Sequence, residues 1–171
     1  MRESVGRAEH QPPAPHVCHI RVKDLDLSRN FLTDLVFDSS CADKLRMLKH
    51  VDVSNNCLFR FPNGMLECKQ LICLSLEYNK IAVIRCPCNL CECNLAMLNL
   101  RRNCLIGIPS PILSLERLRV LDVRGNDFGE ETASLVRCWQ AAQDNRVGKC
   151  RIFLHEDTLP WIASTWASIV R

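Results

Sequence analysis

The sequence predicts an α/β fold built from stacked repeats, and two observations lead to this prediction. Within the stretch Leu95–Leu118, apolar residues recur first at strand spacing and then along a returning segment, with Asn103 between the two parts. The same pattern occurs four more times along the chain. One such unit cannot bury its own apolar face, so the copies are expected to stack on one another.

The central repeat shows how the pattern encodes a shape. Leu98 and Leu100 lie two residues apart, as the inward positions of a short strand do. Asn103 and Leu105 then turn the chain. The returning segment is predicted to be buried through Ile108, Ile112 and Leu115.

An asparagine recurs at the turn of every repeat. The five asparagines are residues 30, 56, 79, 103 and 126, which gives steps of 26, 23, 24 and 23 residues. A near-constant period of this kind is the signature of a repeat array. Because a side-chain amide both donates and accepts, each asparagine is predicted to bond the backbone of neighbouring turns.

This pattern resembles the leucine-rich repeat family, and its 23-residue subclass in particular. The returning segments Phe61–Pro62 and Ile108–Pro109 match the apolar residue before proline in that subclass, and the resemblance covers about residues 22–128. It implies a right-handed solenoid with a short parallel sheet on the concave face and looser or helical turns on the convex face. It also implies a protein-binding scaffold.

The order of parts along the chain follows from these repeats. Residues 1–17 are polar and rich in proline and are predicted to be a flexible leader. Residues 18–128 form about five repeats, the first of which is extended within Val36–Lys44. Residues 129–171 are predicted to be a C-terminal cap.

The cap is predicted to contain a helix, a strand and a second helix. Glu130 and Glu131 open the first helix, which runs to about Asp144 with Leu135, Val136, Trp139 and Ala142 at helical spacing. Cys150–Leu154 is predicted to be a sixth strand with Ile152 and Leu154 pointing inward. The last helix, from Thr158, is expected to close the open end of the core with one apolar face: Leu159, Ile162, Ala163, Trp166 and Val170.

Four of the twelve cysteines lie within Arg85–Asn94: Cys86, Cys88, Cys91 and Cys93. Thiolates suit zinc or copper, so an alternative function is a metal- or redox-responsive regulator. However, the C-x-C-x2-C-x-C spacing differs from two separated C-x2-C pairs, and the repeat template places Cys93 in the core. The sequence therefore favours core and turn thiols over a zinc site, and no cofactor is expected.

Composition and chain ends bear on the compartment. With 47% hydrophobic and 24% charged residues and a net charge of +3, the chain is typical of a globular protein without a membrane or nucleic-acid partner. Residues 1–16 lack a signal-peptide core. Cys138 and Cys150 lack the C-x-C motif that opens the cap of secreted relatives. An intracellular, cytoplasmic location is expected, with a cilium or another organelle assembly left open.

The sequence does not contain a recognisable catalytic constellation. The five histidines are scattered, and no glycine-rich phosphate loop is present. His50 lies on the same strand face as Asp52, an arrangement more often found in an ordinary surface pair than in a catalytic dyad. We therefore expect no enzymatic activity and no small-molecule substrate. The predicted function is an adaptor or scaffold subunit that binds a protein partner on its concave face.

Strand alternation predicts which side chains line that face. The N-terminal repeats present acids and the C-terminal repeats present arginines, and Glu77 and Arg101 are predicted to pair. Tyr78, Met97 and Val120 add aromatic and apolar surface among these charges, and together with Arg102 they are predicted to form the centre of the interface, since tyrosine and arginine are enriched in such centres. Trp161 faces away from the apolar side of the last helix, where it is either an interface anchor or packed on the helix that begins at Glu130. The candidate partner-binding residues are Asp26, His50, Asp52, Glu77, Tyr78, Met97, Asn99, Arg101, Arg102, Asp122, Arg124 and Trp161.

Overall fold

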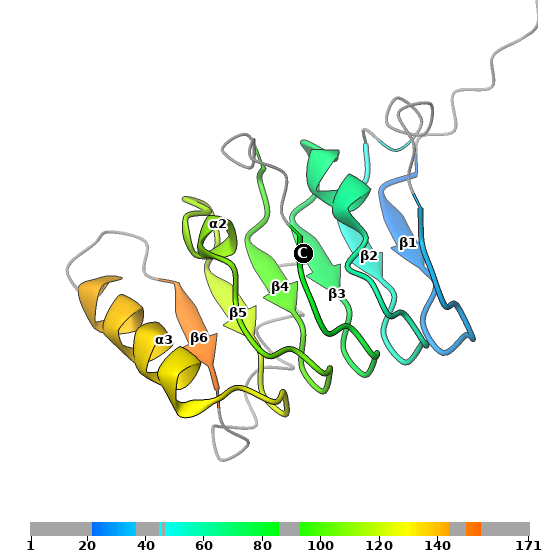
Figure 1. Cartoon of the computed structure of the whole chain (residues 1–171). Helices are drawn as coiled ribbons and strands as arrows, with labels where there is room; N and C mark the ends of the chain where they lie inside the picture. Colours follow the sequence, from blue (N-terminus) through cyan, green and yellow to red (C-terminus); the bar gives the residue numbers. More distant parts are fainter. Residues whose placement is uncertain (1–21, 37–44, 46, 86–92, 144–149, 155–171) are drawn as a thin grey trace, which may run out of the picture.

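The protein is an open solenoid in which six short parallel strands form one sheet in chain order (Figure 1). The structure is a computed structural model that describes residues 22–36, 45, 47–85, 93–143 and 150–154. Each strand has three residues. The strands are β1 (Asp24–Asp26), β2 (His50–Asp52), β3 (Cys73–Ser75), β4 (Met97–Asn99), β5 (Val120–Asp122) and β6 (Arg151–Phe153).

The strands pair in an unbroken register that follows the repeats. The middle residue of every strand points into the main core, and these residues align as Leu25, Val51, Leu74, Leu98, Leu121 and Ile152. The sixth strand predicted from Cys150–Leu154 is therefore confirmed. Ile152 is buried and Leu154 is packed against the core, as expected.

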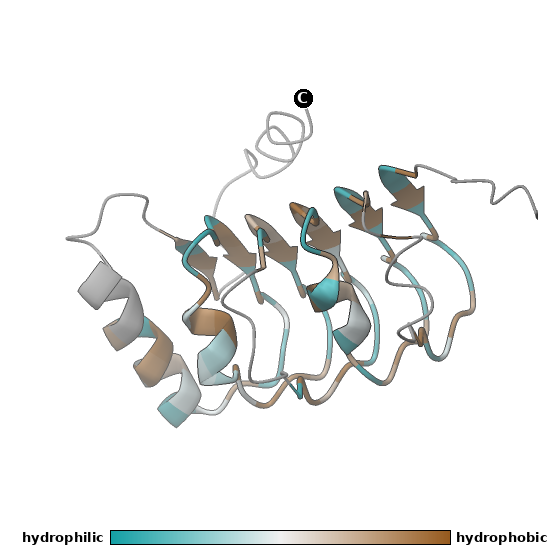
Figure 2. Ribbon diagram, turned by 90° about the horizontal axis from the view of Figure 1, so that it is seen from above, coloured by the Kyte–Doolittle hydropathy of each residue, from teal (hydrophilic) through white to brown (hydrophobic). Residues whose placement is uncertain are grey.

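The returning segments close the other side of the core. Two of them contain a short helical turn, η1 (Asn63–Glu67) and α2 (Ser110–Leu113), and each turn begins directly after a proline. Proline suits a helix start because its φ is already fixed and its missing N–H is not needed there. Figure 2 shows the strands on one side of the molecule and these returning segments on the other.

The repeating asparagines form a continuous hydrogen-bonded ladder. The Asn103 Oδ1 atom accepts from the Ile81 N–H at 3.0 Å, and the Asn103 Nδ2 atom donates to the Leu76 carbonyl at 2.9 Å. Asn56, Asn79 and Asn126 make the equivalent bonds to the repeat before them. The prediction that the amide joins neighbouring turns is confirmed.

The helix α3 (Glu130–Gln143) follows the fifth repeat and packs on β6. Val136 points into the main core and is buried, as helical spacing predicted. Leu135 is 63% exposed, so its expected place on the buried side is wrong. Adjacent residues on a helix point about 100° apart, and the side of α3 that carries Val136 faces the core. The predicted last helix and Trp161 lie outside the described residues.

Candidate protein-binding surface

The concave face of the sheet carries two columns of side chains that run across the strands. The first column contains Asp24, His50, Cys73, Met97, Val120 and Arg151. The second contains Asp26, Asp52, Ser75, Asn99, Asp122 and Phe153. Both columns begin with an aspartate at β1. The first is apolar from β3 to β5 and ends with Arg151, whereas the second stays polar as far as β5 and ends with Phe153.

The two N-terminal strands carry a polar strand patch, which consists of Asp24, Asp26, His50 and Asp52. The His50 Nδ1 atom lies within hydrogen-bonding distance of Asp24 Oδ1 on the neighbouring strand. The sequence interpretation paired His50 with Asp52, whereas in the structure the imidazole contacts Asp24. Residues in register on adjacent strands are closer than residues two apart on one strand, which explains the difference.

Several predicted site residues also hold the backbone of their own turn. The Oδ1 atoms of Asp26 and Asp52 each accept the backbone N–H two residues ahead, at 2.8 Å. Asn99 and Asp122 make the same bond. Bonds from the hydroxyl and the N–H of Ser28 hold the pKa of Asp26 below its ordinary value. These four side chains therefore have a structural role that does not require a partner.

The predicted pair of Glu77 and Arg101 is confirmed. The Arg101 guanidinium lies 3.1 Å from Glu77 Oε1, and the Asn99 amide donates to Glu77 Oε2 at 3.0 Å. Both charged side chains are partly exposed. The acidic and basic halves of the face thus meet at β3 and β4 in a local network.

A second ion pair lies deeper, on the fifth repeat. Arg124 donates from Nε to Asp122 Oδ1 at 2.9 Å and from its terminal nitrogen to Oδ2 at 2.6 Å. The Asp122 side chain is 1% exposed. The Arg124 guanidinium also lies 5.8 Å from the centre of the Phe153 ring. Neither charged group presents open surface to a partner in this structure.

The concave face also carries an apolar cluster that is separate from the main core. This concave apolar cluster contains Cys73, Met97, Val120 and Phe153, and all four side chains are buried. Asn99 is buried beside them. Sequence alternation identified Met97 and Val120 as outward-facing apolar positions, but it did not identify Phe153. Alternation along the sixth strand was the signal for Phe153, because Phe153 lies between the inward Ile152 and Leu154.

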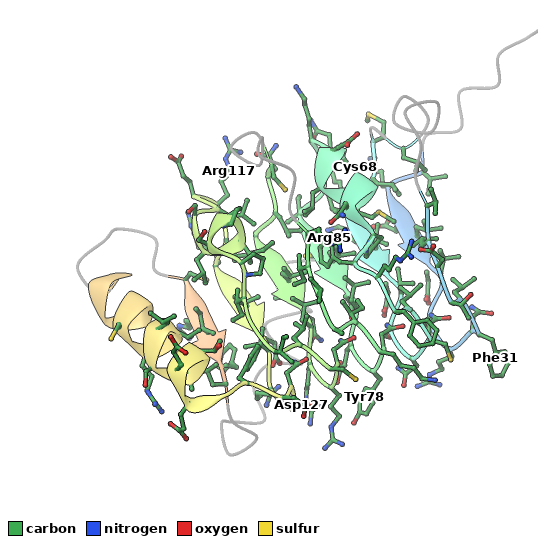
Figure 3. All side chains as sticks on the ribbon, in the orientation of Figure 1. Phe31, Cys68, Tyr78, Arg85, Arg117 and Asp127 are labelled. Atoms are coloured by element: carbon green, nitrogen blue, oxygen red, sulfur yellow. The ribbon has the colours of Figure 1, made fainter. Side chains whose placement is uncertain are left out.

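A row of exposed residues follows the strands along one edge of the solenoid. The members of this turn row adopt left-handed backbone conformations, with φ between 51° and 63°: Arg29, Asn55, Tyr78, Arg102 and Gly125. The first four N–H groups each donate to a carbonyl of the next repeat, at 2.8 to 2.9 Å. In Figure 3, Tyr78, Phe31 and Asp127 lie along this edge, and Cys68 and Arg117 lie along the opposite one.

Tyr78 and Arg102 lie side by side in the turn row. The Arg102 guanidinium carbon is 5.3 Å from the centre of the Tyr78 ring, a cation–π contact. Tyr78 is 41% exposed, and the nearby edge residue Phe31 is 91% exposed. Of the four residues predicted as an interface centre, the structure therefore brings Tyr78 and Arg102 together and leaves aromatic surface accessible there. Met97 and Val120 are instead buried in the concave apolar cluster, because side chains on neighbouring strands pack against one another.

A cavity of about 560 Å³ lies on the side of the returning segments, and sequence reasoning did not predict it. Its lining includes Asp34, Phe59, Arg60 and Arg85. These residues come from three consecutive repeats, so a repeat template read one unit at a time does not reveal the cavity. It does not contain any of the predicted partner-binding residues.

Two solved structures share this architecture. One is a leucine-rich repeat protein of Leptospira interrogans, which matches 78% of this chain with 22% identity and a TM-score of 0.59. The other is an internalin of Listeria monocytogenes, which matches 79% of this chain with 20% identity and a TM-score of 0.55. The chain has the leucine-rich repeat fold.

The leucine-rich repeat chain covers only part of these larger proteins. It spans 37% of the Leptospira protein and 42% of the internalin. No protein-family model matches the sequence, and no curated protein is significantly similar to it. None of the helices in the described ranges is both long enough and apolar enough to span a membrane.

The cysteine-rich stretch of the leucine-rich repeat chain is described only at Cys93. Cys93 is buried in the main core, as the repeat template predicted, and Cys68 occupies the corresponding core position one repeat earlier. Cys86, Cys88 and Cys91 lie outside the described residues. Among the residues that are described, no three metal-ligating side chains come together.

Thiol reactivity is expected to separate the cysteines of this leucine-rich repeat protein into two classes. Burial raises the pKa of Cys73 to about 11 and that of Cys150 to about 12, whereas Cys104 and Cys138 are exposed. At pH 8, iodoacetamide should therefore modify Cys73 about a hundred-fold and Cys150 about a thousand-fold more slowly than the exposed pair. Peptide mapping by mass spectrometry measures the four rates. Equal rates for all four cysteines in the folded protein would contradict this assignment of burial.

Proposed function

We propose that this leucine-rich repeat protein is a non-enzymatic interaction module that binds a protein partner. In this proposal it is an adaptor or scaffold subunit of an intracellular complex. The binding surface consists of the turn row together with the polar strand patch on the concave face. The observation that carries the proposal is the exposed Tyr78–Arg102 pair on a rigid, repeat-bonded backbone.

The backbone of the turn row supports this proposal. A residue other than glycine in the left-handed region costs on the order of 1 kcal/mol, and Gly125 shows that glycine fits the position. Tyr78 and Arg102 nevertheless keep large side chains there. Because their N–H groups are bonded to the next repeat, little backbone freedom would be lost when a partner binds.

The charge distribution gives the surface a direction. Asp24, Asp26 and Asp52 lie at the N-terminal end, whereas Arg101 and Arg102 lie two repeats further on. A partner with basic groups facing the polar strand patch and an acidic group facing Arg102 would dock in one orientation. An apolar pocket on the partner would receive the ring of Tyr78.

The intracellular part of the proposal is supported by the cysteines. The seven cysteines that the structure describes are free thiols, and four of them, Cys68, Cys73, Cys93 and Cys150, are buried among apolar side chains. Buried cysteines of this kind act as small hydrophobic residues and suit a reducing compartment.

The proposal is tested with glycine substitutions in the turn row. Tyr78→Gly combined with Arg102→Gly removes both side chains at positions where φ is positive, so the fold should be retained. The partner is first identified by affinity purification and mass spectrometry from the native cell. Its affinity for the double variant should then fall by about thirty-fold or more, as expected when an interface centre is lost.

Asn55→Gly is the matched control for this experiment. Asn55 belongs to the same row and has the same backbone conformation, with φ of 55°, but it carries neither an aromatic ring nor a charge. Since Asn55 lies in the binding surface but outside its proposed centre, the affinity of this control should fall only a few-fold, far less than that of the double variant. If the double variant and the control bind the partner equally well, the interface lies elsewhere and the proposed surface is incorrect.

A further inference from the structure

The cavity on the side of the returning segments has the size of a binding site, and the proposed concave surface does not include it. Its volume of about 560 Å³ falls within the roughly 300 to 1,000 Å³ that is typical of binding pockets. Three consecutive repeats line this convex cavity. The first contributes Val36, the second contributes Phe59 and Arg60, and the third contributes Val83 and Arg85.

A parallel backbone bridge places the two arginines of the convex cavity on one surface. The bridge joins Arg60 to Val83, and Arg85 follows two residues later. Phe61 and Ile84, the next residue of each segment, are buried in the main core, so Arg60, Val83 and Arg85 project outward together. A spacing of about 4.8 Å between strands and a rise of about 3.3 Å per residue place the Cα atoms of the two arginines about 8 Å apart.

The convex cavity has a basic character. The Arg60 and Arg85 side chains are exposed, and in the part of the chain that the structure describes neither forms an ion pair. A third cation, Lys80, lies with its Nζ atom 5.5 Å from the centre of the Phe59 ring. Asp34 also lines the cavity, but its Oδ1 atom already accepts the N–H of the next residue at 2.9 Å. Guanidinium groups at this spacing suit one carboxylate or two adjacent carboxylates.

Apolar side chains surround these charges and remain open to solvent. Val36 is 77% exposed, Phe59 is 56% exposed and Val83 is 52% exposed. Apolar surface that is exposed together and bordered by polar residues is typical of an interaction site. Small molecules are usually about 70 to 90% buried in their sites, which an open rim of this kind does not provide. A peptide can continue past the rim at both ends.

An unpartnered acceptor supplies a further contact for a peptide. The Asn63 Oδ1 atom, at the start of η1, is buried and has no hydrogen-bond partner within the described residues, and Asn63 lines the convex cavity. A buried acceptor without a donor is unfavourable, and native structures rarely leave one. Asn63 as a whole is only partly buried, so a rotation of its amide brings Oδ1 to the cavity, where a peptide N–H can donate to it.

We propose that the convex cavity binds an acidic peptide segment of a partner protein. Carboxylates of the segment pair with Arg60 and Arg85. An adjacent aromatic side chain packs against Phe59 and Val83, and a backbone N–H donates to Asn63. The cavity lies on the side of the returning segments, away from the concave sheet, so the inference goes beyond the proposed function and does not depend on it.

Isothermal titration calorimetry with an acidic peptide tests this inference on the full-length chain. The probe is the unlabelled heptapeptide Ser-Gly-Asp-Phe-Glu-Gly-Ser. Arg60→Gln combined with Arg85→Gln should weaken its binding about ten-fold or more, because charge-assisted hydrogen bonds to the carboxylates are lost. Both arginines are exposed, so the double variant should unfold in urea at the same midpoint as the wild type.

The matched control is Arg29→Gln combined with Arg117→Gln. It removes two exposed arginines that do not line the cavity, so the peptide affinity should stay within about two-fold of the wild type. A further variant, Val83→Asp, keeps both cavity arginines but adds a carboxylate beside them, and it should also weaken the peptide about ten-fold. Tyr78→Gly combined with Arg102→Gly should leave peptide binding unchanged, which separates this site from the proposed concave surface.

Changes in the probe decide the class of ligand. Replacing its two acids with asparagine and glutamine, or its phenylalanine with alanine, should each weaken binding about ten-fold. Equal binding of the phenylalanine and alanine peptides, together with displacement by inorganic phosphate, would indicate a simple anion site and overturn the inference. The inference is also overturned if the wild type does not bind the probe at millimolar concentration, or if the two double arginine variants bind it equally well.

Discussion

Replacing Asn103 with leucine is expected to lower the free energy of unfolding by about 3 kcal/mol. The Asn103 amide accepts from the Ile81 N–H and donates to the carbonyls of Leu76 and Leu100, and all of these bonds are buried. Leucine has a similar volume but cannot bond these groups, which would then be buried without a partner. Urea unfolding followed by circular dichroism measures the change.

Asn30→Leu is the control within the same ladder. Within the part of the chain that the structure describes, the Asn30 amide donates to carbonyls of its own repeat, those of Leu27 and Ser28, and these bonds are exposed to solvent. Water can replace them, so the expected loss is below about 1 kcal/mol. Equal losses for the two variants would show that the ladder bonds between repeats do not contribute to stability.

Replacing Asp122 with alanine is expected to cost about 3 to 5 kcal/mol of stability. The variant would leave the Arg124 guanidinium buried without the bidentate carboxylate that it contacts at 2.6 and 2.9 Å. A buried charge that loses a bidentate carboxylate is strongly destabilised because the interior solvates it poorly. Thermal and urea unfolding of the variant give the free energy.

Glu77→Ala provides the comparison for this prediction. It breaks an ion pair of the same chemical type with Arg101, but both side chains of that pair are partly exposed and water can solvate the remaining charge. The expected cost is about 1 kcal/mol or less. A larger loss for Glu77→Ala than for Asp122→Ala would refute the role assigned to burial.

Much of the fold could be predicted from the sequence because the same residue pattern recurs in every repeat. The spacing of Leu98, Leu100 and Asn103 identifies an inward strand face followed by a turn, and the period places the next strand. The pair of Glu77 and Arg101 follows from that register alone. Even the sixth strand could be predicted, because Ile152 and Leu154 alternate as strand residues do.

Other features could not be predicted, for physical reasons that differ between residues. Periodicity places Leu135 and Val136 on one helix, but the direction in which the helix meets the core decides that only Val136 is buried. Alternation shows that Met97 points out of the sheet, but it does not show what lies over it. The contact of His50 with Asp24 needs the register between two strands rather than the pattern within one.

The asparagine ladder determines how the molecule is expected to come apart under a mechanical force. Each of the first four repeats is hydrogen-bonded by the asparagine of the repeat that follows it. These asparagines are Asn56, Asn79, Asn103 and Asn126. The asparagine bonds between repeats therefore all run in the same direction along the solenoid. A force along the axis of the solenoid should separate two neighbouring repeats while each repeat stays folded. Losing one asparagine should weaken the boundary between two repeats and leave the other boundaries unchanged.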